Sequence, residues 1–180
     1  LGDQLRPEAG ELVRRLHDLG CHVSLLSGDS AEAVRPVATA LDIRDAHGSM
    51  TPQGKHAFIA RLQQHGAVVA MVGDGVNDAP VLAQAQVSVA MGSGTELARN
   101  QADIVLLGEN LERLAEAVAL ARRTRRIVRQ NLGWAFAYNL SAIPLAMLGW
   151  ITPWMAGIGM SASSLLVVAN ALRLQRDGKP

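Results

Sequence analysis

The sequence predicts an α/β domain with a parallel sheet, followed by a helical hairpin that crosses a membrane. From Leu1 to Asn110, short apolar runs alternate with amphipathic helical stretches, which is typical of parallel strands covered by helices. From Asn131 to Leu172 no Asp, Glu, Lys or Arg occurs. A stretch of that length suits two membrane spans of about 20 residues each.

Composition narrows the range of functions. The 180 residues carry a net charge of +1, so charge gives no argument for a nucleic-acid partner. Cys21 is the single cysteine, which excludes an internal disulfide. We interpret it as a small buried side chain, because Gly20 ends the helix on which His17 and Cys21 could share a metal. The first residue is Leu1 and no signal peptide follows, so we expect a piece of a longer protein.

Periodicity and capping residues predict the elements of the first part. A stripe of leucines and Val13 predicts an amphipathic helix over Pro7–Leu19. Pro52 near the start and Gly66 past the end frame another helix over Pro52–Gln64. The other expected helices cover Ser30–Leu41, interrupted at Pro36, Asn77–Ala85 and a short segment near Glu96; the expected strands are His22–Leu26, Ala67–Val72, Gln86–Met91 and Asp103–Leu107.

A long helix over Leu111–Gln130 is predicted to lead into the uncharged stretch. The segment Gly149–Gly157 contains a proline and two tryptophans, and it suits a turn at the membrane–water interface. Basic residues flank both ends of the pair, so both ends are expected to be cytoplasmic. The alternative, a buried hairpin of a soluble domain, rarely lacks every charge on its outer faces. The flanking basic residues are Arg122, Arg123, Arg125, Arg126 and Arg129, then Arg173, Arg176 and Lys179.

The segment GDGVNDAP, Gly73–Pro80, is the strongest chemical signal. It follows an apolar strand, and the carboxyl ends of parallel strands are where open α/β sheets bind ligands. Asp74 and Asp78, with Asn77 between them, gather the hard oxygens that Mg²⁺ prefers. The alternative is a turn whose Asp and Asn only cap the next helix. Two carboxylates and an amide between glycines disfavour that alternative.

GDGVNDAP resembles the hinge motif of P-type ATPases, the ion pumps built on the haloacid-dehalogenase fold. The resemblance implies that Asp74 holds Mg²⁺ and that Asn77 and Asp78 support a phosphorylation site. It implies a fold in which the first part is the second half of a haloacid-dehalogenase-like phosphorylation domain, with a Rossmann-type parallel sheet.

A second motif, Ser27-Gly28-Asp29, closes the strand that precedes it. A hydroxyl and a glycine amide at a strand end can hold a phosphoryl oxygen, although small turns have the same composition. Together with GDGVNDAP, the segment resembles the second phosphate-binding motif of the dehalogenase fold. The resemblance implies that Ser27 and Gly28 contact the phosphoryl group, that Asp29 shapes the loop, and that Lys55 neutralises phosphoryl charge. A single helical lysine is otherwise usually solvated.

Three motifs of the family do not occur in this sequence. They are the DKTG motif with the nucleophilic Asp, the TGE of the actuator loop, and the nucleotide-binding domain. The chain is therefore expected to form no aspartyl phosphate alone. Its expected partners are the rest of the parent chain, with the nucleotide-binding and actuator domains and earlier transmembrane helices, the lipid bilayer, and a copper chaperone.

The uncharged part carries the clue to the transported ion. Polar residues inside a membrane are functional candidates, and a thioether suits soft Cu(I). Pro144 is expected to interrupt the first span. The order YN, MSxSS, NALRL resembles the last two helices of copper-transporting heavy-metal P-type ATPases. The resemblance implies a Cu(I) site with Tyr138, Asn139, Met160 and Ser164.

The sequence thus predicts four parts: 1–110 a partial phosphorylation domain, 111–130 a basic connecting helix, 131–174 two transmembrane helices and 175–180 a cytoplasmic tail. We predict that the chain is part of a membrane pump that uses ATP and Mg²⁺ to export Cu(I). Three alternatives stay open: a Zn²⁺ or Co²⁺ pump, a soluble phosphatase with an apolar tail, and a non-catalytic membrane scaffold. A Cys-Pro-Cys pair upstream would support copper, and Ser-Pro-Cys would support cobalt.

Overall fold

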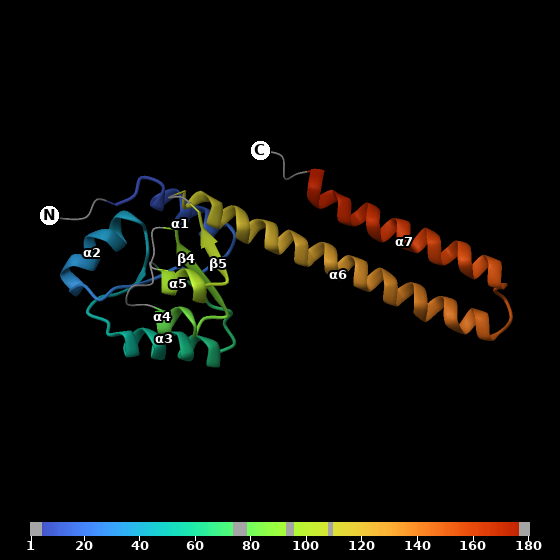
Figure 1. Ribbon diagram of the computed structural model, residues 1–180, viewed down its shortest axis with the longest axis horizontal. Helices are drawn as coiled ribbons and strands as arrows, with labels where there is room; N and C mark the ends of the chain where they lie inside the picture. The colour runs from blue at the N-terminus through green and yellow to red at the C-terminus, as the bar shows by residue number, and fades with distance from the viewer. Residues whose placement is uncertain (1–4, 74–78, 93–95, 108–109, 177–180) are drawn as a thin grey trace. The chain divides into compact units, whose positions relative to one another are not determined.

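The computed structural model describes residues 5–73, 79–92, 96–107 and 110–176. The chain divides into two compact units, Leu1–Glu116 and Ala117–Pro180. Helices and strands alternate in the first unit, whereas the second is entirely helical in its described part (Figure 1). The elements are α1 Ala9–Asp18, β1 Ser24–Leu26, α2 Ala31–Ala40, β2 Asp45–His47, α3 Pro52–Gln64, β3 Ala70–Gly73, α4 Ala79–Leu82, β4 Val87–Met91, α5 Glu96–Gln101, β5 Ile104–Leu106, α6 Glu112–Met147 and α7 Pro153–Arg176.

All described strand pairs are parallel, as predicted, but they form two sheets. One sheet is β1-β2 and the other is β3-β4-β5. The short strand β2, Asp45–His47, was missed by the sequence analysis, because Asp-Ala-His contains no apolar run. Helix α2 continues through Pro36 instead of being interrupted there.

The core of the larger sheet lies on both faces of β4. Val89 packs with Leu106 of β5 and Leu114 of α6, while its neighbour Ala90 packs with Leu82 of α4. Successive strand residues point to opposite faces, so helices must cover both sides of this sheet. Leu12 of α1 joins the first cluster; Met71 and Ala102 join the second.

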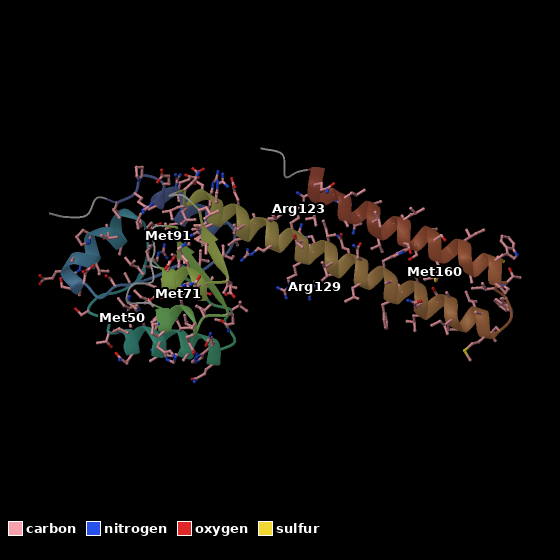
Figure 2. All side chains as sticks on the ribbon, in the orientation of Figure 1. Met50, Met71, Met91, Arg123, Arg129 and Met160 are labelled. Carbon is pink, nitrogen blue, oxygen red and sulfur yellow. The ribbon has the colours of Figure 1, made fainter. Side chains whose placement is uncertain are left out.

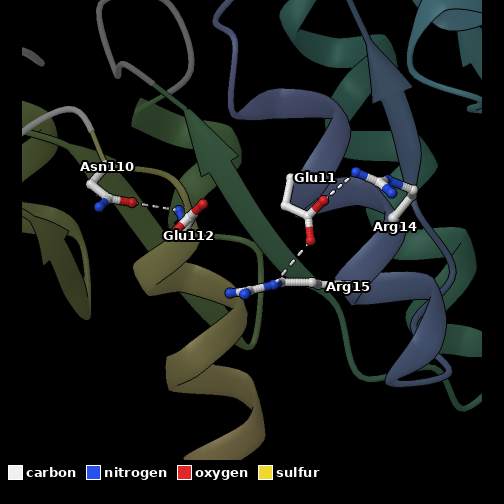
Figure 3. A network of polar contacts seen from close by, with 5 residues as sticks. All are labelled: Glu11, Arg14, Arg15, Asn110 and Glu112. Carbon is white, nitrogen blue, oxygen red and sulfur yellow. Dashed lines mark hydrogen bonds and ion pairs between the residues drawn. The ribbon is translucent and has the colours of Figure 1, made fainter. Parts of the chain in front are cut away.

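Local polar contacts fix the ends of two helices in the first unit. The side chain of Glu11 in α1 accepts hydrogen bonds from Arg14 and Arg15, one turn further along (Figure 3). Such exposed pairs contribute about 0.2–0.5 kcal/mol each. Asn110 Oδ1 accepts from the backbone N–H of Glu112 at 2.9 Å and so caps the start of α6 (Figure 3).

Helices α6 and α7 run antiparallel in the second unit and lie side by side (Figure 1). They are joined by a turn over residues 148–152, which is shorter than the predicted turn and places Trp154 inside α7. Pro144 lies within α6 and does not end it, because the helix continues to Met147. The predicted interruption at this proline was therefore wrong.

One helix in the described ranges is both long and apolar enough to cross a membrane. That segment is Pro153–Gln175 of α7, with a mean hydropathy of 1.6. The second predicted span, in α6, does not meet this criterion. Its uncharged part is bounded by Arg129 and Met147 and contains several amide and hydroxyl side chains, which lower the hydropathy. A pair of transmembrane helices therefore stays a prediction.

Candidate functional site

The loop after β1 is held by the segment that follows β2. Ser27 N donates to His47 O at 2.9 Å, and Met50 N donates to Ser27 O at 2.9 Å. Ser49 N donates to Asp29 O at 2.5 Å. Three backbone bonds thus fix the loop that carries the predicted phosphoryl contacts.

Within this loop, Asp29 pairs with the Ser27 hydroxyl. Ser27 Oγ donates to Asp29 Oδ2 at 2.9 Å and accepts from Asp29 N at 3.2 Å. This agrees with the expectation that Asp29 shapes the loop. A Cβ built on Gly28 would lie 3.7 Å from Met50 O, an ordinary contact, so space alone does not require glycine here.

Lys55 lies in the first turn of α3, and the residues just before α3 contact the Ser27 loop. Thr51 is the N-cap of α3, since its Oγ1 accepts from Gly54 N at 3.0 Å, and Pro52 is the first helical residue as predicted. Met50 donates to the carbonyl of Ser27, and the next residue, Thr51, is the N-cap of α3. The start of α3 therefore lies beside the Ser27 loop. The structure therefore brings Ser27, Gly28 and the turn that carries Lys55 into one neighbourhood.

The strand before GDGVNDAP begins three residues later and ends one residue later than the predicted Ala67–Val72, so that it includes the first glycine of the motif. Gly73 is the last residue of β3, and it pairs in parallel with Ala90 of β4. Asp74, Asn77 and Asp78 lie outside the described residues, so the predicted Mg²⁺ ligands have no described geometry. The chain resumes at Ala79, the first residue of α4.

An aspartate–histidine pair on β2 was not recognised from the sequence. Asp45 Oδ2 accepts from Ser24 Oγ at 2.5 Å, and Asp45 Oδ1 lies 2.8 Å from His47 Nε2. The ring of His47 packs against Phe58, with 5.0 Å between ring centroids. The alternation Asp-Ala-His, which sets both polar side chains on one face of a strand, is the signal that could have found the pair.

Burial and hydrogen bonding act in opposite directions on Asp45. Burial disfavours its charged form, but the hydrogen bonds from Ser24 and His47 and the nearby charges of His47 and His22 outweigh it and lower the pKa of Asp45. A surface cavity of about 310 Å³ is lined in part by Asp45 and by the half-buried Cys21. No cluster of three potential metal ligands occurs among the described side chains. Cys21, interpreted from the sequence as buried, is half-buried.

In the second unit, Tyr138 is the predicted Cu(I) residue that faces the partner helix. A Cβ built on Gly159 would lie only 2.6 Å from the Tyr138 hydroxyl oxygen, so this side chain covers bare backbone of α7. Figure 2 marks Met160, the next residue along α7. Tyr138 and Met160 thus lie at the same level of the hairpin.

The other three predicted residues do not converge with Tyr138 inside this chain. Asn139 Nδ2 donates to Ala135 O of its own helix at 2.9 Å, and Ser164 Oγ donates to Met160 O at 3.0 Å. All three are exposed, and Met160 is 65% exposed. Ser163 contacts α6 instead, where its Oγ accepts from Trp134 Nε1 at 3.1 Å. The sequence analysis did not identify Ser163 as the serine that contacts α6. Ser163 and Ser164 are the same residue type and differ only in the helix face on which they lie, which the sequence pattern does not show.

Comparison with known proteins decides the family. The haloacid dehalogenase-like hydrolase model matches residues 1–86. A probable copper-exporting P-type ATPase V of Mycobacterium tuberculosis is 45% identical over 179 residues, which are 99% of this chain and 23% of that protein. The chain belongs to the heavy-metal P-type ATPases. A copper-exporting P-type ATPase of Staphylococcus aureus is 44% identical over 176 residues, covering 98% of this chain and 22% of its own length.

A solved member of the P-type ATPases has the same fold. The crystal structure of a zinc-transporting PIB-type ATPase in the E2.Pi state matches with a TM-score of 0.88 and 36% identity, over 96% of this chain and 28% of that chain. The chain therefore spans less than a quarter of the length of the curated relatives it matches. It contains the predicted dehalogenase-like unit with parallel sheets and one apolar helix, whereas the predicted second membrane span is not confirmed.

Proposed function

We propose that the protein of which this chain is part exports Cu(I) across a membrane at the expense of ATP, through an aspartyl phosphate. The observation that carries the proposal is similarity to copper-exporting P-type ATPases over 98–99% of the chain, which includes both GDGVNDAP and the hairpin. The nucleophile, the ATP-binding domain and the actuator domain are then supplied by the rest of the parent protein.

In this proposal, the first unit stabilises the phosphoryl group. Asp74 holds Mg²⁺, which neutralises phosphate charge when bound, and Asn77 and Asp78 support the site. Ser27 and Gly28 contact the transferring phosphoryl group, and Lys55 offsets its charge. The hydrogen bonds that fix the Ser27 loop next to the first turn of α3 support this division of roles.

The hairpin completes the metal site and anchors the protein in the membrane. Tyr138, Asn139, Met160 and Ser164 offer neutral oxygens and a thioether, which suit a soft monovalent cation. Because three of these side chains are exposed in this chain, their remaining neighbours belong to earlier transmembrane helices of the parent. Both ends of the hairpin lie in the cytoplasm, where a copper chaperone is a candidate donor.

The second candidate is a Zn²⁺ pump, which the similarity to a zinc-transporting ATPase favours. The test is ATP hydrolysis by the full-length protein in proteoliposomes with Cu(I), Zn²⁺ or Co²⁺. We expect stimulation by Cu(I), and loss of phosphorylation without loss of Cu(I) binding in Asp74→Asn. Stimulation by Zn²⁺ alone would replace copper with zinc, and phosphorylation retained in Asp74→Asn would remove Asp74 from its role.

The chain on its own is predicted to be catalytically inactive. It carries no DKTG motif, so no side chain is available to accept the γ-phosphate of ATP. Purified chain incubated with ATP labelled at the γ-phosphate should take up no acid-stable label. Hydroxylamine-sensitive labelling of this chain would contradict the proposal.

A further inference from the structure

Three amide side chains join α6 and α7 at the end of the hairpin that carries the arginines. Asn170 Nδ2 donates to Asn131 Oδ1 at 2.8 Å and to Gln130 Oε1 at 3.3 Å. Asn131 Nδ2 in turn donates to Val167 O at 3.4 Å, and Asn170 Oδ1 accepts from Arg173 Nη1 at 3.2 Å. We call Gln130, Asn131 and Asn170 the amide clamp.

Each side-chain nitrogen and oxygen of Asn131 and Asn170 has at least one hydrogen-bond partner. Both hydrogens of the Asn170 amide and its oxygen are used, and Asn131 uses its oxygen and one hydrogen. Both asparagines are half-buried between the helices. In a membrane, where water cannot replace a lost partner, such a satisfied pair holds two helices in one arrangement.

The contacts along the interface follow one antiparallel register. Asn131 meets Asn170, Trp134 meets Ser163, and Tyr138 covers Gly159. Sliding α7 by one turn would break the first two contacts and move a different residue opposite Tyr138. The amide clamp is therefore a contact that depends on the register, as single buried asparagines do in coiled coils.

We propose that Asn131 and Asn170 are positioning residues that fix the register of α6 against α7, and thereby set Tyr138 at the level of Met160. The inference rests on the proposed function, because it assigns Tyr138 and Met160 to the transported ion. Neither asparagine touches the ion; each acts through the helix on which the ion's residues lie.

The test uses the full-length protein with Asn131→Leu, Asn170→Leu and the double substitution. Leucine has nearly the shape of asparagine, and the double variant leaves no half-buried asparagine unpaired, whereas each single variant leaves one. Gln130 loses Asn170 in the double variant, but it is exposed and can bond water instead. We expect each single variant to melt at a lower temperature than the native protein, and the double variant to recover most of that loss. The double variant should nevertheless need about tenfold more Cu(I) for half-maximal ATP hydrolysis, with a maximal rate changed less than about twofold.

Ser141→Ala is the matched control. Among the described residues, Ser141 Oγ donates to Ala137 O and Tyr138 O of its own helix, so its loss should leave both melting and the Cu(I) requirement unchanged. Pulsed electron paramagnetic resonance between nitroxide labels on Arg129→Cys and Gln175→Cys reports the register directly, since one helical turn is about 5 Å. We expect a single distance in the native background and a broadened or shifted one in the double leucine background.

A shifted label distance with an unchanged Cu(I) requirement would contradict the positioning role, and so would an unchanged distance. If the double variant does not accumulate in membranes, Asn170→Ser is measured instead, because its shorter side chain loses Asn131 while remaining polar; an unchanged Cu(I) requirement there would also contradict the role. Absence of Cu(I) stimulation in the native protein would contradict the proposed function itself.

Discussion

The polar and sulfur-containing side chains of α7 differ in what they contact. This difference distinguishes the side chain that packs on α6 from those of the proposed metal site. Ser163 faces α6 through Trp134, whereas Met160 and Ser164 are exposed one turn apart on another side of the helix. Exposed thioethers in an apolar helix have little to pack against in this chain. Met160 is therefore the sharpest single residue on which to test the proposed site.

We predict that Met160→Leu leaves the full-length protein folded and inserted but impairs Cu(I)-stimulated ATP hydrolysis. Leucine nearly preserves volume and usually costs less than about 1.5 kcal/mol, but it removes the sulfur that a soft cation prefers. Cu(I) stoichiometry and stimulated turnover are the measurements. The matched control is Met147→Leu, since Met147 is 84% exposed at the end of α6 and has no assigned role. Equal results for the two variants would assign Met160 to packing.

Short elements of the first unit are joined by carboxylates that bridge neighbouring strands. Asp45 of β2 accepts from Ser24 of β1, its partner in the strand register. Asp103, just before β5, accepts from both the N–H and the hydroxyl of Ser88, which is buried in β4. Hydrogen bonds from Ser88 lower the pKa of Asp103, as the bonds to Asp45 lower its own pKa. Each carboxylate thus stabilises its sheet in the charged form.

Acid should weaken these sheets. A carboxyl whose pKa is lower in the folded than in the unfolded state stabilises the fold above its unfolded pKa, near 3.8, and loses that contribution as the pH falls through the folded value. We predict that the melting temperature, followed by circular dichroism, decreases as the pH is lowered below about 4. Asp45→Asn should melt lower at neutral pH and lose less on acidification. A variant with the native acid dependence would contradict this role for Asp45.

At the scale of the whole molecule, helix α6 belongs both to the α/β unit and to the apolar helical pair. Helix α6 begins in the first unit, where Leu114 packs on the sheet, and continues into the second. No Asp or Glu occurs in the described part of the second unit, whereas several arginines do. This asymmetry matches a basic cytoplasmic edge beside a membrane span.

We predict that the hairpin crosses the membrane twice. In the full-length protein in cells, a cysteine introduced as Trp150→Cys should react with a membrane-impermeant thiol reagent added outside. Gln175→Cys should react only after the membrane is permeabilised, because both ends of the hairpin are expected in the cytoplasm. Protection of position 150 together with external labelling of position 175 would instead show that α7 alone spans the bilayer.

The sequence by itself determined the parallel α/β pattern, the capped helix α3 and the uncharged helical pair. These follow from periodicity, capping residues and runs of one polarity, which are local properties. Tertiary structure alone decided that the strands form two sheets, that Asp45 pairs with His47 and Ser24, and that Ser163 rather than Ser164 meets α6. Strand partners and helix faces depend on contacts between residues distant in the chain, so local pattern cannot specify them.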